Sequence, residues 1–198
     1  MFDSNASPVT IDRGRLCLAN GLVLSFQRFA LPETGTFEHL PTSLGALPVG
    51  SGVQDDFVLP LAMDEAFWIG LSLTSSAIPV SVGVEAELKD GRVLDALSSQ
   101  AWSPESHTVV TVPGVPRIAG FPRPDGCTDA FFRASERTGT WGCSCLRIHA
   151  SRKLPPVAEP PLNVTVRLLD YAGFSAETGL PPPDKLDEHS GYRGWRLP

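Results

Sequence analysis

Residues 57–73, with the sequence FVLPLAMDEAFWIGLSL, form the densest apolar run in the chain and decide the fold. Successive residues of a strand point to opposite faces. From residue 66 onward this rule places Phe67, Ile69, Leu71 and Leu73 on one face and Trp68, Gly70 and Ser72 on the other. The run therefore predicts a central buried strand that begins after a short turn. Asp64 and Glu65 are interpreted as turn acids, because neighbours on a strand cannot easily serve one substrate.

The composition predicts one all-β domain. The chain has 198 residues, of which 42% are hydrophobic and 19% charged, as is typical of a globular protein with a sizeable core. Its 19 prolines and 18 glycines are spread along the sequence and favour many short elements joined by turns. Two segments, 31–52 and 113–126, are so rich in these breakers that we expect long ordered loops there.

Two alternating patterns predict further strands. In residues 15–26, Asn20-Gly21 separates two apolar runs, which is typical of a β-hairpin with a type I′ turn, where both central residues have positive φ. Residues 80–88 alternate between apolar and polar side chains, so this strand has one face on the core and one in water. Glu85 belongs to the solvated face in this interpretation. Shorter strands are expected at 108–112 and 163–170.

Strand-like runs on both sides of a Gly-containing turn predict a second hairpin over 127–149. With a symmetric turn, Cys127 lies opposite His149 and Asp129 lies opposite Arg147. This pairing brings a thiol within reach of an imidazole, as a cysteine nucleophile requires. These four residues are the candidate catalytic group, and the alternative is that they are neighbours with a structural role only.

Aromatic and basic residues supply a candidate ligand site. Binding residues tend to lie on loops that a rigid scaffold positions, so loops 31–52 and 113–126 are the expected binding surface. The candidate ligand-binding residues are Trp68, Arg117, Arg123 and Trp141.

One hypothesis for the cysteines is a zinc site. Its ligands would be Cys127, Cys143, Cys145 and His149. A strand rises about 3.3 Å per residue, so Cys145 and His149 would stand about 13 Å apart. Zinc ligands, however, lie within about 2.3 Å of one ion. We therefore expect no metal and no cofactor. Cys143 and Cys145 also have a poor geometry for bridging each other, so free thiols are expected.

The net charge of −6 argues against nucleic acid and against an anionic membrane surface as partners. The sequence contains no apolar run near the roughly 20 residues that span a bilayer. Its N-terminus, MFDSNASP, lacks the basic and apolar regions of a secretory signal. These observations favour a cytoplasmic protein with reduced cysteines.

Several segments together carry a resemblance to known sequences. The matching segments are 26–32 (FQRFALP), 40–48 (LPTSLGALP), 61–69 (LAMDEAFWI), 80–84 (VSVGV), 112–116 (VPGVP) and the strand at 142–148. Over residues 15–150 the chain resembles a group of uncharacterised bacterial soluble β-rich proteins without assigned activity. It departs from that group in the C-terminal part and at Cys143 and Cys145, where the group has glycine and aliphatic residues. The resemblance implies a β-rich fold and a bacterial cytoplasmic setting, and it carries over no catalytic residue.

The sequence thus predicts an all-β protein, namely a two-layer antiparallel β-sandwich with jelly-roll-like connections over residues 11–170. A flexible N-terminal arm (1–10) precedes it. An extended C-terminal tail (171–198) follows. We expect its Tyr192 and Trp195 to attach it to the domain or to a second subunit.

The functional hypothesis is a non-catalytic binding or accessory protein that engages a small molecule or a protein through loops 31–52 and 113–126. The alternative is a small bacterial enzyme that uses the polar surface of the 127–149 hairpin. A homodimer held by the C-terminal tail is a third hypothesis.

Overall fold

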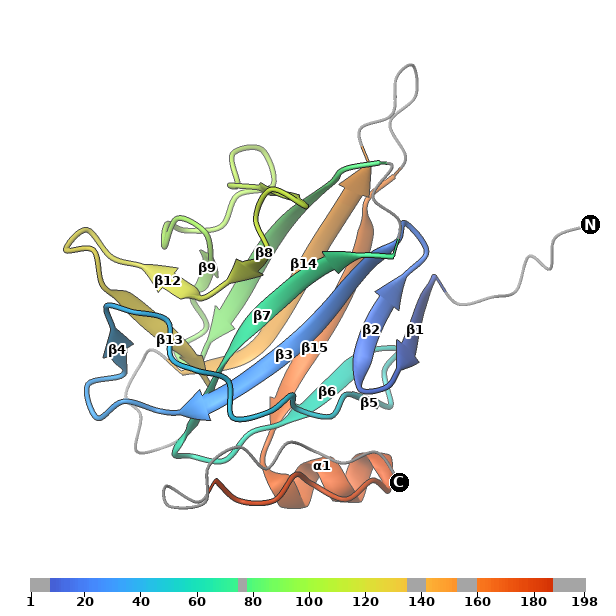
Figure 1. Cartoon of the computed structure of the whole chain (residues 1–198), viewed down its shortest axis with the longest axis vertical. Coiled ribbons are helices and arrows are strands. Elements are labelled where there is room, and N and C mark those ends of the chain that lie inside the picture. Colours follow the sequence, from blue (N-terminus) through green and yellow to red (C-terminus); the bar gives the residue numbers. More distant parts are fainter. Residues whose placement is uncertain (1–7, 75–77, 135–141, 153–159, 187–198) are drawn as a thin grey trace, which may run out of the picture.

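The computed structural model describes residues 8–74, 78–134, 142–152 and 160–186, which fold into two packed β-sheets (Figure 1). The all-β prediction is confirmed. The first sheet has the spatial order β1 (Val9–Asp12), β2 (Arg15–Leu18), β3 (Leu22–Ala30), β7 (Glu65–Leu73), β13 (Thr128–Phe132) and β12 (Gly120–Pro122). Two short strands extend it, β11 (Arg117–Ile118) beside β7 and β4 (Thr36–Phe37) beside β13.

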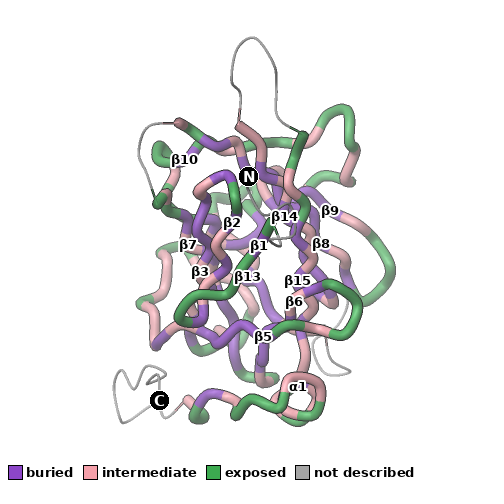
Figure 2. The backbone as a smooth tube through the Cα atoms, turned by 90° about the vertical axis from the view of Figure 1, so that its right-hand side faces the viewer, coloured by how far each residue is buried: buried purple, intermediate pink, exposed green. Residues whose placement is uncertain are grey.

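The second sheet is antiparallel except at one pair of strands. Its spatial order is β10 (Val110–Val112), β8 (Val80–Leu88), β14 (Cys143–Arg152), β15 (Leu162–Leu169), β6 (Phe57–Pro60) and β5 (Gly50–Ser51), with β9 (Val93–Asp95) also beside β8. The strands β15 and β6 run parallel. Figure 2, turned by 90°, separates β3 and β7 from β8 and β15, and much of each of these strands is coloured as buried.

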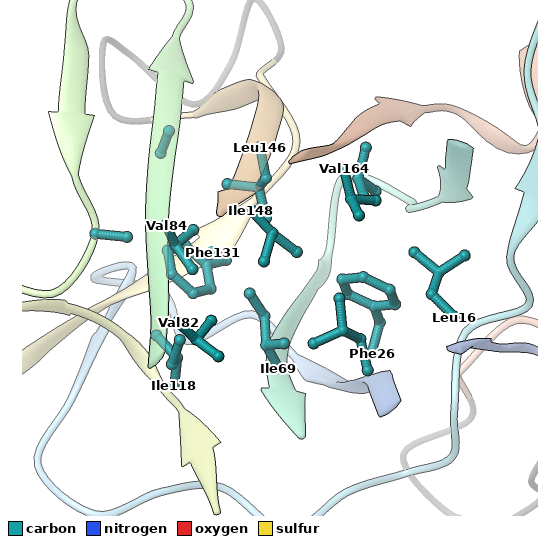
Figure 3. Packing of buried hydrophobic residues seen from close by; sticks show 14 of the residues in the cluster. Leu16, Phe26, Ile69, Val82, Val84, Ile118, Phe131, Leu146, Ile148 and Val164 are labelled. Carbon is teal, nitrogen blue, oxygen red and sulfur yellow. The ribbon is translucent and has the colours of Figure 1, made fainter. Parts of the chain in front are cut away.

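The core lies between the sheets because each contributes the apolar face of its alternating strands. Phe26 and Ile69 of the first sheet point toward Val84, Ile148 and other residues of the second (Figure 3). All four of these side chains have no exposed surface. The two-residue period predicted for 80–88 therefore holds on the core face of β8.

The run 57–73 is two strands and not one. Its first part, β6, belongs to the second sheet, and β7 belongs to the first, between β3 and β13. Residues 61–64 connect the two sheets, and Met63 and Asp64 in this connection are exposed. The predicted faces of β7 are confirmed, since Phe67 and Ile69 are buried and Trp68 is only half-buried.

The hairpin predicted at 15–26 is confirmed as β2 and β3, but its turn differs from the expected type. Gly21 has a φ of 84°, whereas Asn20 has no positive φ. The Asn20 side chain is buried, accepts from the N–H of Leu22 at 3.2 Å and donates to the carbonyl of Ala150 at 3.4 Å. This turn therefore links the first sheet to β14 of the second.

The prediction of a hairpin over residues 127–149 is wrong. β13 pairs with β7, β12 and β4 in the first sheet, while β14 pairs with β8 and β15 in the second. Alternation specifies which residues share a face, but it does not specify the partner strand. Among the described residues, a single isolated β-bridge, between Arg133 and Cys143, joins the two segments that were expected to pair.

The two predicted loops are partly built into the sheets. Segment 31–52 contributes β4 and β5, and its Leu47 is buried in the core with its N–H bonded to the carbonyl of Phe26 at 2.7 Å. Segment 113–126 contributes β11 and β12. Short pairing segments survive between the prolines because each needs only two or three residues.

The prediction of an extended tail from residue 171 is wrong over α1 (Tyr171–Thr178). The Asp170 side chain caps this helix by accepting from the N–H of Gly173 at 2.7 Å, and Gly179 ends it with a φ of 70°. Phe174 is fully buried, so the helix packs against its own domain. Tyr192 and Trp195 lie outside the described residues. The described part of the chain has no helix with the length and apolar character that a membrane span requires.

A buried ion pair fixes the start of β7 to the C-terminal segment. Arg28 is 2% exposed and Glu65 is 1% exposed, and Arg28 Nη1 lies 3.1 Å from Glu65 Oε1. The Tyr171 hydroxyl donates to the same carboxylate oxygen at 2.6 Å, and Arg28 Nη1 donates to the carbonyl of Asp184 at 2.7 Å. Glu65 is therefore a structural group and not a surface turn acid, whereas Asp64 is exposed as expected.

Arg167 makes a second link between the helix and the sheets. It projects from the outer face of β15 and forms ion pairs with Asp56 and with Glu177 of α1. The hydrogen bond from Arg167 lowers the pKa of Asp56 and also that of Glu177. Both carboxylates are thus held in the charged form.

Candidate functional site

The outer face of the second sheet carries polar side chains from three adjacent strands. His149 of β14 lies in register with Gly83 of β8 on one side and Asn163 of β15 on the other. Two residues further along β14, Ser151 lies opposite Ser81. Because side chains alternate along a strand, all of these positions face away from the core.

A loop over residues 96–109 lies on this face, and Asp95 holds both of its ends. The Asp95 carboxylate accepts from the N–H of Leu97 at 2.8 Å and from the N–H of Thr108 at 2.6 Å. Asp95 is 2% exposed. Burial acts to raise the pKa of Asp95, but the bonds from the backbone N–H groups outweigh it and lower that pKa. A buried carboxylate therefore stays charged and fixes the loop.

Three rings pack together where the loop meets the sheet. Trp102 is stacked on His107 with ring centroids 4.6 Å apart and on His149 with centroids 4.9 Å apart. The two imidazoles lie 6.2 Å from each other. Gly83 makes room for this arrangement, since a Cβ at that position would stand 3.0 Å from His107 Cδ2. The rings form a rigid aromatic wall.

Polar contacts fix the orientation of His149. Its Nδ1 lies 2.8 Å from Asn163 Oδ1, which makes Nδ1 the donor and the amide oxygen the acceptor. Its Nε2 lies 3.4 Å from Glu85 Oε2, close enough for an ion pair with a protonated ring. Within the described residues this nitrogen makes no hydrogen bond, and the atom itself is buried.

Glu85 is buried, which corrects its predicted place on a solvated face. It is 8% exposed, and its carboxylate pairs with Arg147. The loop that carries Trp102 lies over this part of β8, and sequence alternation contains no information about such a cover. The adjacent Glu87 is half-buried and accepts from Arg147 Nη2 at 2.9 Å.

These groups surround an open hollow of about 580 Å³, here called the Trp102 hollow. Its lining consists of Ser81, Glu85, Trp102, Pro104, His107, Val109, His149, Ser151, Arg152, Pro161 and Asn163. Arg152 is engaged at the rim, where its Nε donates to the carbonyl of Asn20 at 2.8 Å. The hollow combines one aromatic wall, a few apolar residues and several polar groups, as small-molecule sites do.

The structure does not bring the four candidate catalytic residues together. Cys127 and Asp129 belong to the first sheet or its margin, whereas Arg147 and His149 lie on the outer face of the second. Asp129 is 3.4 Å from Arg123 instead of pairing with Arg147. Burial and the nearby Asp125 raise the pKa of the Cys127 thiol, which disfavours the thiolate that a nucleophile needs.

The candidate ligand-binding residues also lie away from the Trp102 hollow. Arg117 is exposed on β11, and Arg123 is engaged with Asp125 at 3.1 Å. Trp68 is on the outer face of the first sheet, where it packs against a small cluster that includes Phe29. Trp141 lies outside the described residues.

The thiols and the acidic groups form no metal centre in the described part of the chain. Cys143 and Cys145 flank a β-bulge on β14 and are both buried. Burial raises the pKa of the Cys143 thiol to about 12 and also raises that of Cys145. All four cysteines are free.

Trp102, His107, Glu85 and Asn163 were not among the sequence candidates. One signal for them was present, because Gly83 interrupts a strand of alternating valines. A glycine inside a strand often marks the close approach of another group, and here that group is His107. The comparisons with protein-family models, with curated proteins and with solved structures gave no match to this chain.

Proposed function

We propose that this protein is a non-catalytic binding protein that takes a small molecule in the Trp102 hollow. One observation carries this proposal, namely the stack of Trp102 on His107 and His149 at the wall of a 580 Å³ hollow. Stacked rings that are fixed before a ligand arrives lose little conformational freedom on binding. A hollow of this size matches the common range for small-molecule sites.

Two further observations support binding over catalysis. The Nε2 atom of His149 is buried and has no hydrogen-bond partner among the described residues, so it is poorly placed to contact a ligand. The enzyme alternative also needs Cys127, which belongs to the other side of the molecule and has a raised pKa. A nucleophile and its base must stand within hydrogen-bond reach.

The proposed site replaces loops 31–52 and 113–126 as the main binding surface. Parts of both loops are engaged in sheet pairing, and Leu47 and Val49 of the first are buried in the core. A bacterial cytoplasmic setting remains our proposal, supported by the four free cysteines. The homodimer hypothesis has less support, because the first part of the tail packs Phe174 into its own domain.

The proposal can be tested by a small-molecule screen observed through the indole N–H resonances of ¹⁵N-labelled protein. We expect a bound molecule to shift the Trp102 resonance and to leave that of Trp68 in place, because Trp68 lies on the other sheet. Replacement of Trp102 by alanine should abolish the thermal stabilisation by the same molecule. Ligands that shift only residues remote from the hollow, or turnover that depends on Cys127, would contradict the proposal.

A further inference from the structure

We infer that the ligand class of the Trp102 hollow is a neutral saccharide; this inference rests on the proposed binding function. It is motivated by three properties of the lining, which are its aromatic wall, its charge balance and its unengaged polar groups.

The aromatic wall suits the apolar face of a sugar ring. Trp102 is stacked on two imidazoles and is itself only half-buried. An indole presents a flat, electron-rich face, and aliphatic C–H groups pack well against it. A pyranose carries C–H groups on the faces of its ring and hydroxyls around its rim. It can therefore lie against Trp102 and direct its hydroxyls toward the sheet.

The charge balance of the lining favours a neutral ligand. The Glu85 carboxylate already pairs with Arg147, which also pairs with Glu87. Arg152 is directed to the carbonyl of Asn20 at the rim. A cationic ligand would have to compete with Arg147 for Glu85 and Glu87. Any charged ligand would also lose its own hydration, whereas a neutral one leaves these contacts in place.

The unengaged polar groups can both donate and accept. Within the described part of the chain, the hydroxyls of Ser81 and Ser151 make no hydrogen bond. The Asn163 side chain uses its oxygen for His149, which leaves its NH₂ group free to donate. A ligand hydroxyl is also both donor and acceptor, so it can satisfy each of these groups.

The arrangement of these groups distinguishes a saccharide from a planar heterocycle. Ser81, Ser151 and Asn163 belong to three adjacent strands, which are spaced about 4.8 Å apart. They are thus spread along the sheet surface. A planar base has its polar atoms on one thin edge, whereas a sugar ring has hydroxyls around its whole rim and can reach groups on several strands.

The test is a titration of the full chain with glucose, galactose, mannose, N-acetylglucosamine and their β-1,4-linked disaccharides. Saturation-transfer NMR and the Trp102 indole resonance report binding. Sorbitol is the matched ligand control, because it carries hydroxyls without a ring face, and adenosine is the planar alternative. We expect at least one saccharide to bind at the hollow and sorbitol to bind more weakly.

Two variants check the assigned contacts. Trp102→Ala should weaken saccharide binding by about tenfold or more, a loss that corresponds to about 1.4 kcal/mol. Ser151→Ala should weaken it by about fivefold, as the loss of one hydrogen bond implies, and it leaves the ring stack intact should Trp102→Ala fail to fold. Ser72→Ala, at an exposed position on the first sheet, is the matched control and should bind like the wild type.

The outcomes separate the two proposals. If no saccharide binds while adenosine or another molecule of the wider screen shifts the Trp102 resonance, the saccharide inference is wrong and the binding function stands. If nothing in either panel perturbs the hollow, both are overturned. Saccharide binding that Ser151→Ala and Trp102→Ala leave unchanged would also overturn the inference, since the site would lie elsewhere.

Discussion

Asp95 and Thr108 are joined by a 2.6 Å hydrogen bond from the backbone N–H of Thr108 to the Asp95 carboxylate, across 13 residues of chain. The same carboxylate accepts from the N–H of Leu97 at 2.8 Å. One buried side chain thus closes the loop that carries Trp102 and His107. The aromatic wall of the hollow depends on this closure.

Replacement of Asp95 by alanine should therefore destabilise the fold and open the loop. Two backbone N–H groups would lose a charged acceptor, at a cost of up to about 3 kcal/mol in the free energy of unfolding. Urea denaturation measures this loss, and the Trp102 indole resonance reports the loop. Asp90→Ala, at an exposed turn, is the control and should cost much less. An Asp95→Ala protein with wild-type stability would show that the closure is unimportant.

Gly83→Ala should disturb the ring stack. The added Cβ would stand 3.0 Å from His107 Cδ2, so the imidazole must move, and overpacking of this kind costs about 1 kcal/mol. Imidazole and indole resonances should shift for His107 and Trp102. In a His107→Ala background the same substitution should cost almost nothing, because the obstructed ring is gone. If Gly83→Ala lowers the stability equally in both backgrounds, the loss does not come from contact with the His107 ring.

Glu65→Gln should be among the most destabilising conservative substitutions. It leaves the guanidinium of Arg28 buried without a carboxylate, and the breaking of a buried ion pair costs about 3–5 kcal/mol. Asp64→Asn, at the exposed neighbour, is the matched control and should have little effect. Urea denaturation distinguishes the two variants, and similar stabilities would contradict the role given to the buried pair.

Tyr171 should resist ionisation. Burial first, and the neighbouring Glu65 second, raise its pKa above the usual value of 10.0. A pKa that is higher in the folded state contributes stability below the unfolded-state pKa, and this contribution disappears as the pH rises through the folded-state value. Absorbance at alkaline pH should therefore show a late phenolate transition that Tyr171→Phe removes. If the transition that Tyr171→Phe removes lies near pH 10 while the fold is intact, this environment is contradicted.

Arg167→Met should reduce stability at neutral pH more than at acid pH. Arg167 lowers the pKa values of Asp56 and Glu177, so these pairs contribute stability above the ordinary carboxyl pKa of about 4. This contribution disappears as the pH falls through the lowered values. In urea denaturation, the free energy of unfolding of the wild type should exceed that of the variant by about 1–2 kcal/mol at pH 7. This difference should become smaller toward pH 2. The exposed Arg117→Met change should show no such dependence on pH.

The fold class could be predicted from sequence because alternation is a local property. The faces of β7 and β8 follow from their own residues, as does the hairpin around Gly21. Start and stop signals for α1 are also present in Asp170 and Gly179, although its short, glycine-containing sequence shows little helical periodicity.

The candidate site could not be predicted to the same extent because it depends on pairing between distant segments. His149 was identified, but its predicted partner, Cys127, belongs to the opposite sheet. A strand that ends near residue 132 and one that begins near 143 are compatible both with a hairpin and with a crossing between sheets. The burial of Glu85 likewise depends on a loop that joins the sheet at Asp95 and Thr108.

The parallel pairing of β6 with β15 has a consequence for how the chain matures as it is synthesised. β6 ends at Pro60, but its parallel neighbour begins at Leu162. About a hundred residues must therefore leave the ribosome before this edge is covered, whereas β1, β2, β3 and β7 can already associate by Leu73. Nascent chains that stall before Leu162 leave this edge of β6 without its strand partner, and unpaired strand edges are prone to aggregation.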